Sequence, residues 1–187
     1  MKFNNHSHLN GLHALFSPSQ PSWLNYDDDK FFQVYTNKKA AALGTRYHEW
    51  AAETIELGIK QSVSKKSSTR TIALYVNDAI GYKMTPEVPL VYGKFFGTAD
   101  AICFRHGVLR IHDLKTGKTP AHIEQLMAYA ALFCLEYRVK PGDIEIKLRI
   151  YQNDEVLCHD AETDEIVPIM DKIIHFNELW EKLDKEV

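Results

Sequence analysis

Apolar residues recur at every second position on both sides of a short dipeptide in the middle of the chain. The dipeptide is His106-Gly107, and the alternating positions are Ile102, Phe104, Leu109 and Ile111. Alternation with a period of two is typical of half-buried strands, and a two-residue connection is typical of a tight β-hairpin. The strands that we predict in this region cover residues 88–92, 94–104 and 108–114.

Four further segments have the composition or spacing of helices. We expect helices at residues 38–57 after an N-cap at Asn37, at 71–83, from Pro120 (after an N-cap at Thr119) to the break at 140–142, and from near Pro168 onward. Apolar residues surround most of the third helix, which indicates a buried helix lying on the sheet.

A second alternating stretch follows the third helix. Ile144, Ile146, Leu148 and Ile150 mark a half-buried strand, and Asn153-Asp154 turns the chain back. A strand reached through a helix is typical of a parallel crossover. The predicted fold class is therefore α/β, with a central mixed sheet of antiparallel hairpins plus one parallel crossover strand, flanked by helices.

Two aspartates are predicted to meet across the central hairpin. If Arg105 pairs with Val108, Asp100 lies opposite Asp113, on the face that carries the alternating apolar residues. Facing carboxylates repel each other, and a divalent cation between them relieves this repulsion. Oxygen ligands favour Mg²⁺ or Mn²⁺ over zinc, and Lys115 on the same face could orient or deprotonate a water. Ordinary salt bridges of Asp113 and Lys115 are the alternative interpretation.

Three polar side chains on the predicted helices are further candidates. His48 lies in the first helix, on a stripe with Ala41, Thr45, Ala52 and Ile55. A single helical histidine is more often structural than a ligand. The other two candidates, one turn apart on the third helix, are Gln125 and Tyr129, for which helix packing is the alternative role.

Four short motifs occur in a fixed order along the chain. They are G-x-x-x-H (44–48), G-x-x-D (97–100), D-x-K-T-G (113–117) and Q-x-x-x-Y (125–129). Together they resemble the RecB-like branch of the PD-(D/E)XK nucleases, which includes recombination-helicase nuclease domains, CRISPR-adaptation nucleases and small phage or prophage exonucleases. The resemblance covers Gly44 to Tyr129, and it implies a restriction-endonuclease-like core in a single domain of residues 1–187, with residues 1–36 as an irregular arm.

The resemblance implies a role for each matching residue. His48, Asp100, Asp113 and the backbone carbonyl of Leu114 would bind the metal, and Lys115 would act with the two aspartates in catalysis. Gln125 and Tyr129 would support the site and contact the nucleic acid strand. Many relatives also carry an acid at the position of Glu87, whose role is the least defined.

The implied activity is hydrolysis of DNA with Mg²⁺ or Mn²⁺, as an exonuclease in recombination, replication or phage DNA metabolism. Several relatives hold an iron-sulfur cluster through four cysteines, but this chain has only Cys103, Cys134 and Cys158. We therefore expect no iron-sulfur cluster and no disulfide, and we expect these thiols to be small buried residues. A phosphate-binding loop is excluded, since His112 occupies the position of its first glycine, and Ala52 excludes a zinc-protease signature.

Composition adds few constraints. The chain has 187 residues, 45% of them hydrophobic, which is sufficient for one core. No apolar run reaches the roughly 18 residues of a membrane span, and the polar start lacks a signal-peptide pattern, so we expect a cytoplasmic protein of a bacterium or infected host that does not bind membranes.

Charge leaves the partner open. Nucleic-acid-binding proteins usually carry a basic surface, and the net charge of −3 does not indicate one. DNA binding would therefore depend on a local group of basic residues. Candidates for phosphate contacts are Lys38, Lys39, Arg46, Lys65, Lys66 and Arg70. A regulatory nucleic-acid-binding protein that has lost activity, an RNA-directed nuclease, a homo-oligomer and a requirement for a partner protein all remain open alternatives.

Overall fold

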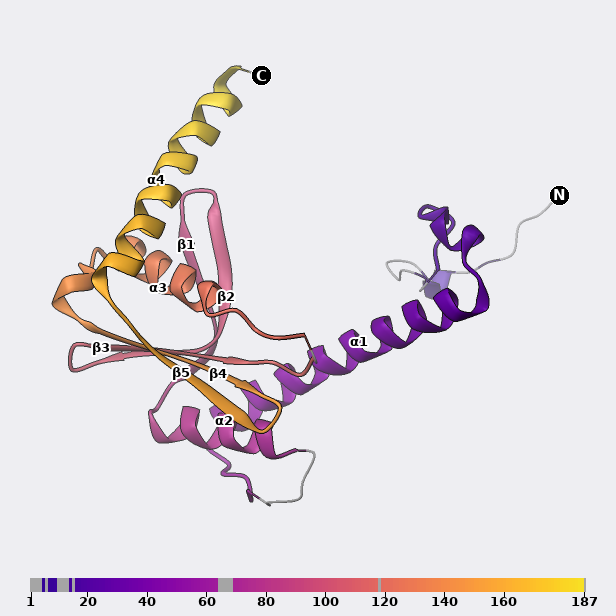
Figure 1. Ribbon diagram of the computed structural model, residues 1–187, viewed down its shortest axis with the longest axis horizontal. Helices are drawn as coiled ribbons and strands as arrows, with labels where there is room; N and C mark the ends of the chain where they lie inside the picture. Colours follow the sequence, from indigo (N-terminus) through magenta and orange to yellow (C-terminus); the bar gives the residue numbers. More distant parts are fainter. Residues whose placement is uncertain are drawn as a thin grey trace. The chain divides into compact units, whose positions relative to one another are not determined.

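The centre of the fold is a five-stranded mixed sheet, seen in a computed structural model that describes residues 5, 7–9, 14, 16–63, 69–117 and 119–186 (Figure 1). The strand order is β1-β2-β3-β4-β5. Only the β3·β4 pair is parallel, and the other three pairs are antiparallel. The strands are β1 (Thr85–Tyr92), β2 (Phe95–Arg105), β3 (Val108–Leu114), β4 (Glu145–Gln152) and β5 (Glu155–Ala161). The α/β class with a mixed sheet is confirmed.

The central hairpin has the predicted register. Arg105 pairs with Val108, and the ladder continues to the pair formed by Ala101 and His112. Both turn residues, His106 and Gly107, have positive φ angles of 51° and 74°. This is the left-handed conformation of a tight two-residue hairpin, and glycine adopts it at no steric cost.

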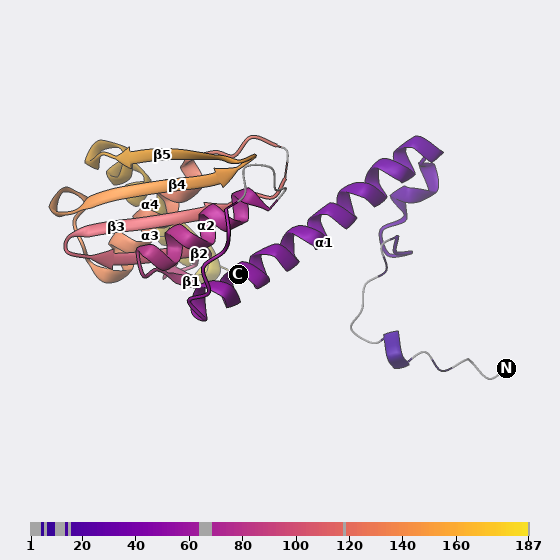
Figure 2. The same ribbon diagram turned by 90° about the horizontal axis from the view of Figure 1, so that it is seen from below.

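Helices cover both faces of the sheet. On one face lie α3 (Glu124–Tyr137) and α4 (Thr163–Glu186), and on the other lies α2 (Arg70–Gly81) (Figures 1 and 2). The part of α1 (Asp28–Glu56) that follows Gly44 packs with α2, where Ala51 and Ile55 join a buried cluster. A short 3-10 helix, η3 (Pro141–Asp143), precedes β4. The two faces therefore have separate apolar cores.

The chain divides into two compact units, Met1–Leu43 and Gly44–Val187. The first unit contains two short 3-10 helices, η1 (Ser7–Leu9) and η2 (Pro21–Asn25), and the beginning of α1. The second unit contains the sheet, the rest of α1 and the other helices.

The first long helix begins earlier than predicted. Asn37 lies inside α1, so its assignment as an N-cap is wrong, and residues 28–36 are helical. The Asp27 carboxylate caps the helix instead, because its Oδ1 accepts a hydrogen bond from the backbone N–H of Lys30 at 2.8 Å. Asp28 and Asp29 in the first turn further complement the helix dipole.

Two other helix starts also differ from the prediction. The Thr119-Pro120 segment precedes α3, which begins only at Glu124. Conversely, α4 begins at Thr163 and contains Pro168. The Glu165 carboxylate accepts a hydrogen bond from the backbone N–H of Glu162 at 2.8 Å, and this capping interaction fixes a start upstream of the proline.

The cysteines are only partly as expected. Cys103 and Cys134 are buried, but Cys158 is exposed on β5, and all three are free thiols. Among the described residues, no helix combines the length and apolarity that crossing a bilayer requires.

The β1–β2 turn is held by α4. Asn177 on α4 accepts a hydrogen bond from the backbone N–H of Lys94 at 2.9 Å. Gly93 in this turn has a φ of 57°, and a Cβ atom at this position would overlap the Asn177 side chain. The turn therefore needs glycine both for its conformation and for the close approach of α4.

We predict that Gly93→Ala lowers the free energy of unfolding by about 1–3 kcal/mol, because overpacking adds to the strain of positive φ. Gly81→Ala is the matched control, since no atom lies within 4 Å of a Cβ there and its φ is not positive. Denaturant unfolding of the two variants measures the difference. Equal stabilities of the two variants would contradict this role of the turn.

Candidate metal centre

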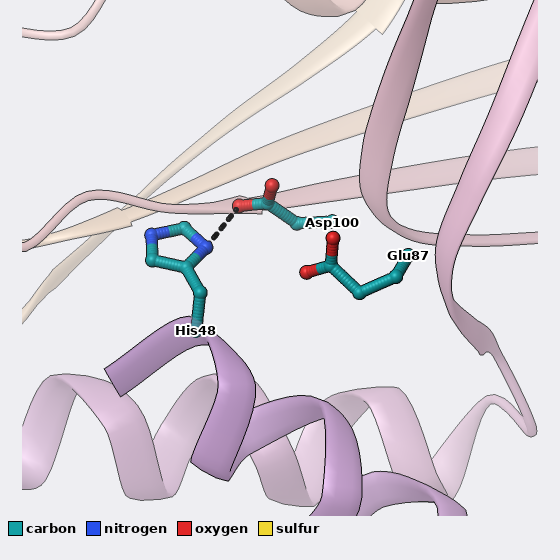
Figure 3. Close-up of side chains that lie close together, drawn as sticks. All are labelled: His48, Glu87 and Asp100. Atoms are coloured by element: carbon teal, nitrogen blue, oxygen red, sulfur yellow. Dashed lines mark ion pairs between the residues drawn. The ribbon is translucent and has the colours of Figure 1, made fainter. Parts of the chain in front are cut away.

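Three side chains from three elements converge at one end of the central hairpin. His48 comes from α1, Glu87 from β1 and Asp100 from β2 (Figure 3). One ligand atom of each lies within 4.8 Å of the others, and His48 Nδ1 is 3.3 Å from Asp100 Oδ2. His48 and Asp100 are half-buried and Glu87 is exposed. One imidazole nitrogen and two carboxylates thus surround a single point.

The backbone at Glu87 brings this group together. Pro86 pairs with Ala101 and Val88 pairs with Ala99, so Glu87 lies opposite Asp100. Glu87 has a φ of 50°, a left-handed conformation that costs a non-glycine residue on the order of 1–3 kcal/mol. Strain of this kind at a cluster of charged side chains is typical of functional sites.

The strand β2 changes the direction of its side chains at this level. Ala99 packs in the core beneath α3, whereas Ala101 packs in the core beneath α2, although alternation would place both on one face. The expectation that Asp100 shares the face of Ile102 is therefore wrong. The Asp100 carboxylate reaches His48 on α1, and α1 covers the face of Ala101. A local irregularity in strand pairing produces this change.

Asp100 also contacts the end of β3. Its Oδ2 accepts a hydrogen bond from the backbone N–H of Leu114 at 2.9 Å. Leu114 is fully buried in the core beneath α2. This bond fixes the position of the β3 terminus relative to the carboxylate. The role of the Leu114 carbonyl as a ligand stays a prediction.

A second polar group lies next to the first and contains Asp113, Lys115 and Gln125. Lys115 Nζ lies 3.0 Å from both carboxylate oxygens of Asp113 and donates to Gln125 Oε1 at 2.9 Å. Asp113 is only 3% exposed. The structure thus joins three of the predicted site residues directly. Asp113 is outside the 4.8 Å group that the described residues form around His48, where Glu87 takes the expected place.

The two groups are electrostatically coupled. Burial raises the pKa of Asp113, and the charge of Asp100 raises it further, while Lys115 opposes both effects. Glu87 is exposed as a residue, but the partial burial of its carboxyl group and the charge of Asp100 still raise its pKa. The hydrogen bond to Asp100 raises the pKa of His48. The charge of Asp100 therefore makes both Glu87 and Asp113 harder to ionise, and a cation would relieve the excess negative charge.

The donor atoms suit a hard divalent cation. Within the described part of the chain, Asp113 Oδ2 is buried and accepts no hydrogen bond of good geometry, although it lies near Lys115 Nζ. The Lys115 ammonium is the positive partner of this buried oxygen, which still has room for a further interaction. Carboxylate oxygens with one imidazole fit Mn²⁺ or Mg²⁺, and no cysteine contributes. His48, Glu87 and Asp100 are the residues whose ligand atoms are close enough to hold such an ion, and a ligand role of Asp113 stays a prediction.

Two glycines of the sequence motifs permit close contacts around the site. A Cβ on Gly44 would lie 2.8 Å from Thr116 Oγ1, so α1 approaches the segment that follows Lys115. A Cβ on Gly97 would lie 2.9 Å from the ring of Tyr129, which packs over β2. Tyr129 thus has a packing role, and its contact with nucleic acid stays a prediction.

The predicted histidine stripe is only partly correct. The buried positions of α1 include Gly44, Ala51 and Ile55, whereas Ala41 and Thr45 are exposed. His48 lies one turn after Gly44, so the glycine that brings the helix close to Thr116 also brings His48 close to Asp100.

Sequence reasoning gave Glu87 no definite role, and it did not identify Gln152. Gln152 on β4 donates through Nε2 to the carbonyls of Gly117 and Thr119, both at 2.7 Å, and accepts from the N–H of Ala121 at 3.2 Å. These bonds fix the segment between Lys115 and α3. Because the contacts are with backbone atoms, no motif in the sequence signals them.

The basic residues proposed for phosphate contacts come from different segments of the chain. Arg46 is exposed on α1, and Arg70 begins α2. Lys38 and Lys39 lie in the first unit, where they contact the rings of Phe16 and Tyr35. Lys65 and Lys66 lie outside the described residues.

Comparisons with protein-family models and with curated protein sequences found no match to this chain.

We predict that Gly44→Ala destabilises the protein by about 1–3 kcal/mol, because the new methyl group meets Thr116 Oγ1. In a Thr116→Ala background no other atom lies within 4 Å of that methyl group. There the same substitution should stabilise the helix by up to about 1 kcal/mol. Thr116→Val is the matched control, since it keeps an atom near the position of Oγ1. A double-mutant cycle of thermal unfolding gives the coupling, and additive effects would contradict the close approach.

Proposed function

We propose that the protein is a metal-dependent nuclease that hydrolyses DNA phosphodiester bonds, an exonuclease with the restriction-endonuclease-like core of the RecB-like nucleases. The observation that carries the proposal is the adjacency of two groups. The buried Asp113–Lys115 pair lies at the end of β3, beside the convergence of His48, Glu87 and Asp100. A lysine paired with one carboxylate, next to a cluster of an imidazole and two further carboxylates, suits metal-assisted phosphodiester hydrolysis.

The cofactor that we propose is Mg²⁺ or Mn²⁺, held by His48, Glu87, Asp100 and Asp113. When bound, such an ion lowers the pKa of a coordinated water and stabilises the extra negative charge on the phosphate in the transition state. The left-handed backbone of Glu87 and the Leu114–Asp100 hydrogen bond hold the carboxylates in place beforehand. Pre-organisation of this kind limits rearrangement during the reaction.

Lys115 has two roles in this proposal. Its ammonium counters the charge of the phosphate, and it orients the attacking water by hydrogen bonding. Asp113 and Gln125 hold Nζ from two sides, so the ammonium has a defined position before substrate arrives. Gln125 therefore supports the site through Lys115.

The proposed partner is DNA and the proposed compartment is the cytoplasm. The second candidate is a nucleic-acid-binding or regulatory protein without cleavage activity. One observation favours it: the Lys115 ammonium is already engaged by Asp113 and Gln125. A substrate has to compete with those contacts, and a protein that only binds nucleic acid would keep them.

The proposal predicts that the purified protein degrades labelled DNA with Mn²⁺ or Mg²⁺ and that EDTA stops the reaction. Asp113→Asn should reduce cleavage at least about 100-fold, because it removes a buried charge near the reacting phosphate. The same variant should be more stable than wild type in EDTA, since one of the mutually repelling carboxylates is gone.

Lys115→Ala should lose turnover while Mn²⁺ affinity, measured by calorimetry, is retained.

The controls use a second lysine–aspartate pair on the sheet. Lys147 Nζ lies 3.2 Å from Asp160 Oδ2, and both residues lie away from the candidate centre. Lys147→Ala and Asp160→Asn should leave cleavage unchanged. DNA binding without cleavage under either metal would contradict the nuclease proposal and support a nucleic-acid-binding protein without activity. Cleavage of RNA but not of DNA would show that RNA is the substrate.

A further inference from the structure

A cavity of about 290 Å³ lies beside Lys115 on the side of α1 and α2. Four parts of the second unit form its walls: the second half of α1, the first turn of α2, the end of β3 and the β4–β5 turn. The side chains used below are Tyr47, Thr71, Lys115 and Asp154. The volume is close to the lower limit of small-molecule sites, which begins at roughly 300 Å³.

The Asp154 wall of the cavity is rigidly built. Asn153 and Asp154 have φ angles of 51° and 64°, so both turn residues are left-handed. Asp154 Oδ1 accepts hydrogen bonds from the N–H and the hydroxyl of Thr71 at 3.1 and 2.9 Å. The N–H of Asp154 donates to Thr71 Oγ1 at 2.7 Å. Three hydrogen bonds, two of them to the carboxylate, thus fix Asp154 against α2.

All of these bonds leave the second carboxylate oxygen of Asp154 free to act as an acceptor. Within the described residues, no hydrogen bond to Asp154 Oδ2 is formed. The half-buried aromatic residue Tyr47 also lines the cavity. An aromatic face with a fixed acceptor matches a nucleobase that carries an exocyclic amino group. Beside Asp154 a phosphate group fits poorly, because the carboxylate charge repels it, whereas Lys115 lines another part of the cavity.

We propose that this cavity is a nucleobase pocket for a nucleotide next to the scissile phosphate, an inference that rests on the proposed function. The phosphate lies toward Lys115, the base stacks on Tyr47, and its amino group donates to Asp154 Oδ2. A base inside the pocket has left any duplex, so the substrate is unpaired at this position. The pocket therefore favours cytosine, which presents an amino group, over thymine, which presents a carbonyl oxygen.

The test compares two labelled single-stranded octanucleotides, oligo-dC and oligo-dT. Cytosine carries an amino group where thymine carries a carbonyl oxygen, and thymine has an additional methyl group. Anisotropy titrations of the full-length protein in EDTA measure binding without cleavage. We expect oligo-dC to bind about fivefold more tightly, the effect of one hydrogen bond. Equal affinities, a preference for oligo-dT, or no binding of either probe would overturn the pocket.

Asp154→Asn is the decisive variant. Its amide oxygen keeps the two bonds from Thr71, so an NH₂ group replaces Oδ2 and the preference should reverse toward oligo-dT. Asp160→Asn, an exposed aspartate elsewhere on the sheet, should keep the wild-type preference. Tyr47→Leu should weaken the binding of both probes about tenfold. Tyr47→Phe should bind both probes with wild-type affinity, because the aromatic ring remains.

Cleavage of the same oligonucleotides in Mn²⁺ separates this inference from the proposed function. If wild type cuts both probes and Asp154→Asn does not change the base preference, the proposal of a nucleobase pocket is wrong and the nuclease assignment stands. If the preference reverses in binding but no probe is cut, the pocket stands and the nuclease assignment is wrong.

Discussion

Mutual repulsion among carboxylates at the end of the central hairpin is the constraint on which the site depends. Asp100, Asp113 and Glu87 come from three adjacent strands, and the charge of Asp100 raises the pKa of the other two carboxyl groups, of which Asp113 is almost completely buried. Lys115 and His48 offset part of this charge. A fold gains no stability from this arrangement, which is why we interpret it as a site for a divalent cation and an anionic substrate.

The backbone around these side chains is arranged to hold them in this unfavourable proximity. The left-handed Glu87 lies opposite Asp100, and there β2 redirects its side chains from the α3 core to the α2 core. Gly44 lets α1 approach Thr116, which places His48 over the same point. Strain at Glu87 and close contact at Gly44 both act on the positions of ligand atoms, and the two apolar cores supply the stability that tolerates them.

The strands and the register of the central hairpin could be predicted from the sequence, because they depend on local patterns. Alternating apolar residues and a two-residue turn were sufficient for the hairpin register from Arg105–Val108 to Ala101–His112. The register alone did not give the direction of the Asp100 side chain, since the alternation on β2 breaks between Ala99 and Ala101. Two of the misplaced helix starts are set by local caps at Asp27 and Glu165, which compete with the start signals at Asn37 and Pro168. Before the third helix, Gln152 binds the backbone of residues 117, 119 and 121, and these non-local contacts are not visible in the sequence.

The most direct test of the account is a crystal structure of the protein grown with Mn²⁺, with the ion located by its anomalous scattering. The account predicts one strong peak at the hairpin end, within about 2.4 Å of an atom from each of His48, Glu87 and Asp100 and next to the Asp113 carboxylate. No peak at that position, with the three side chains still held by protein contacts alone, would contradict the claim that these charges are assembled for a metal ion.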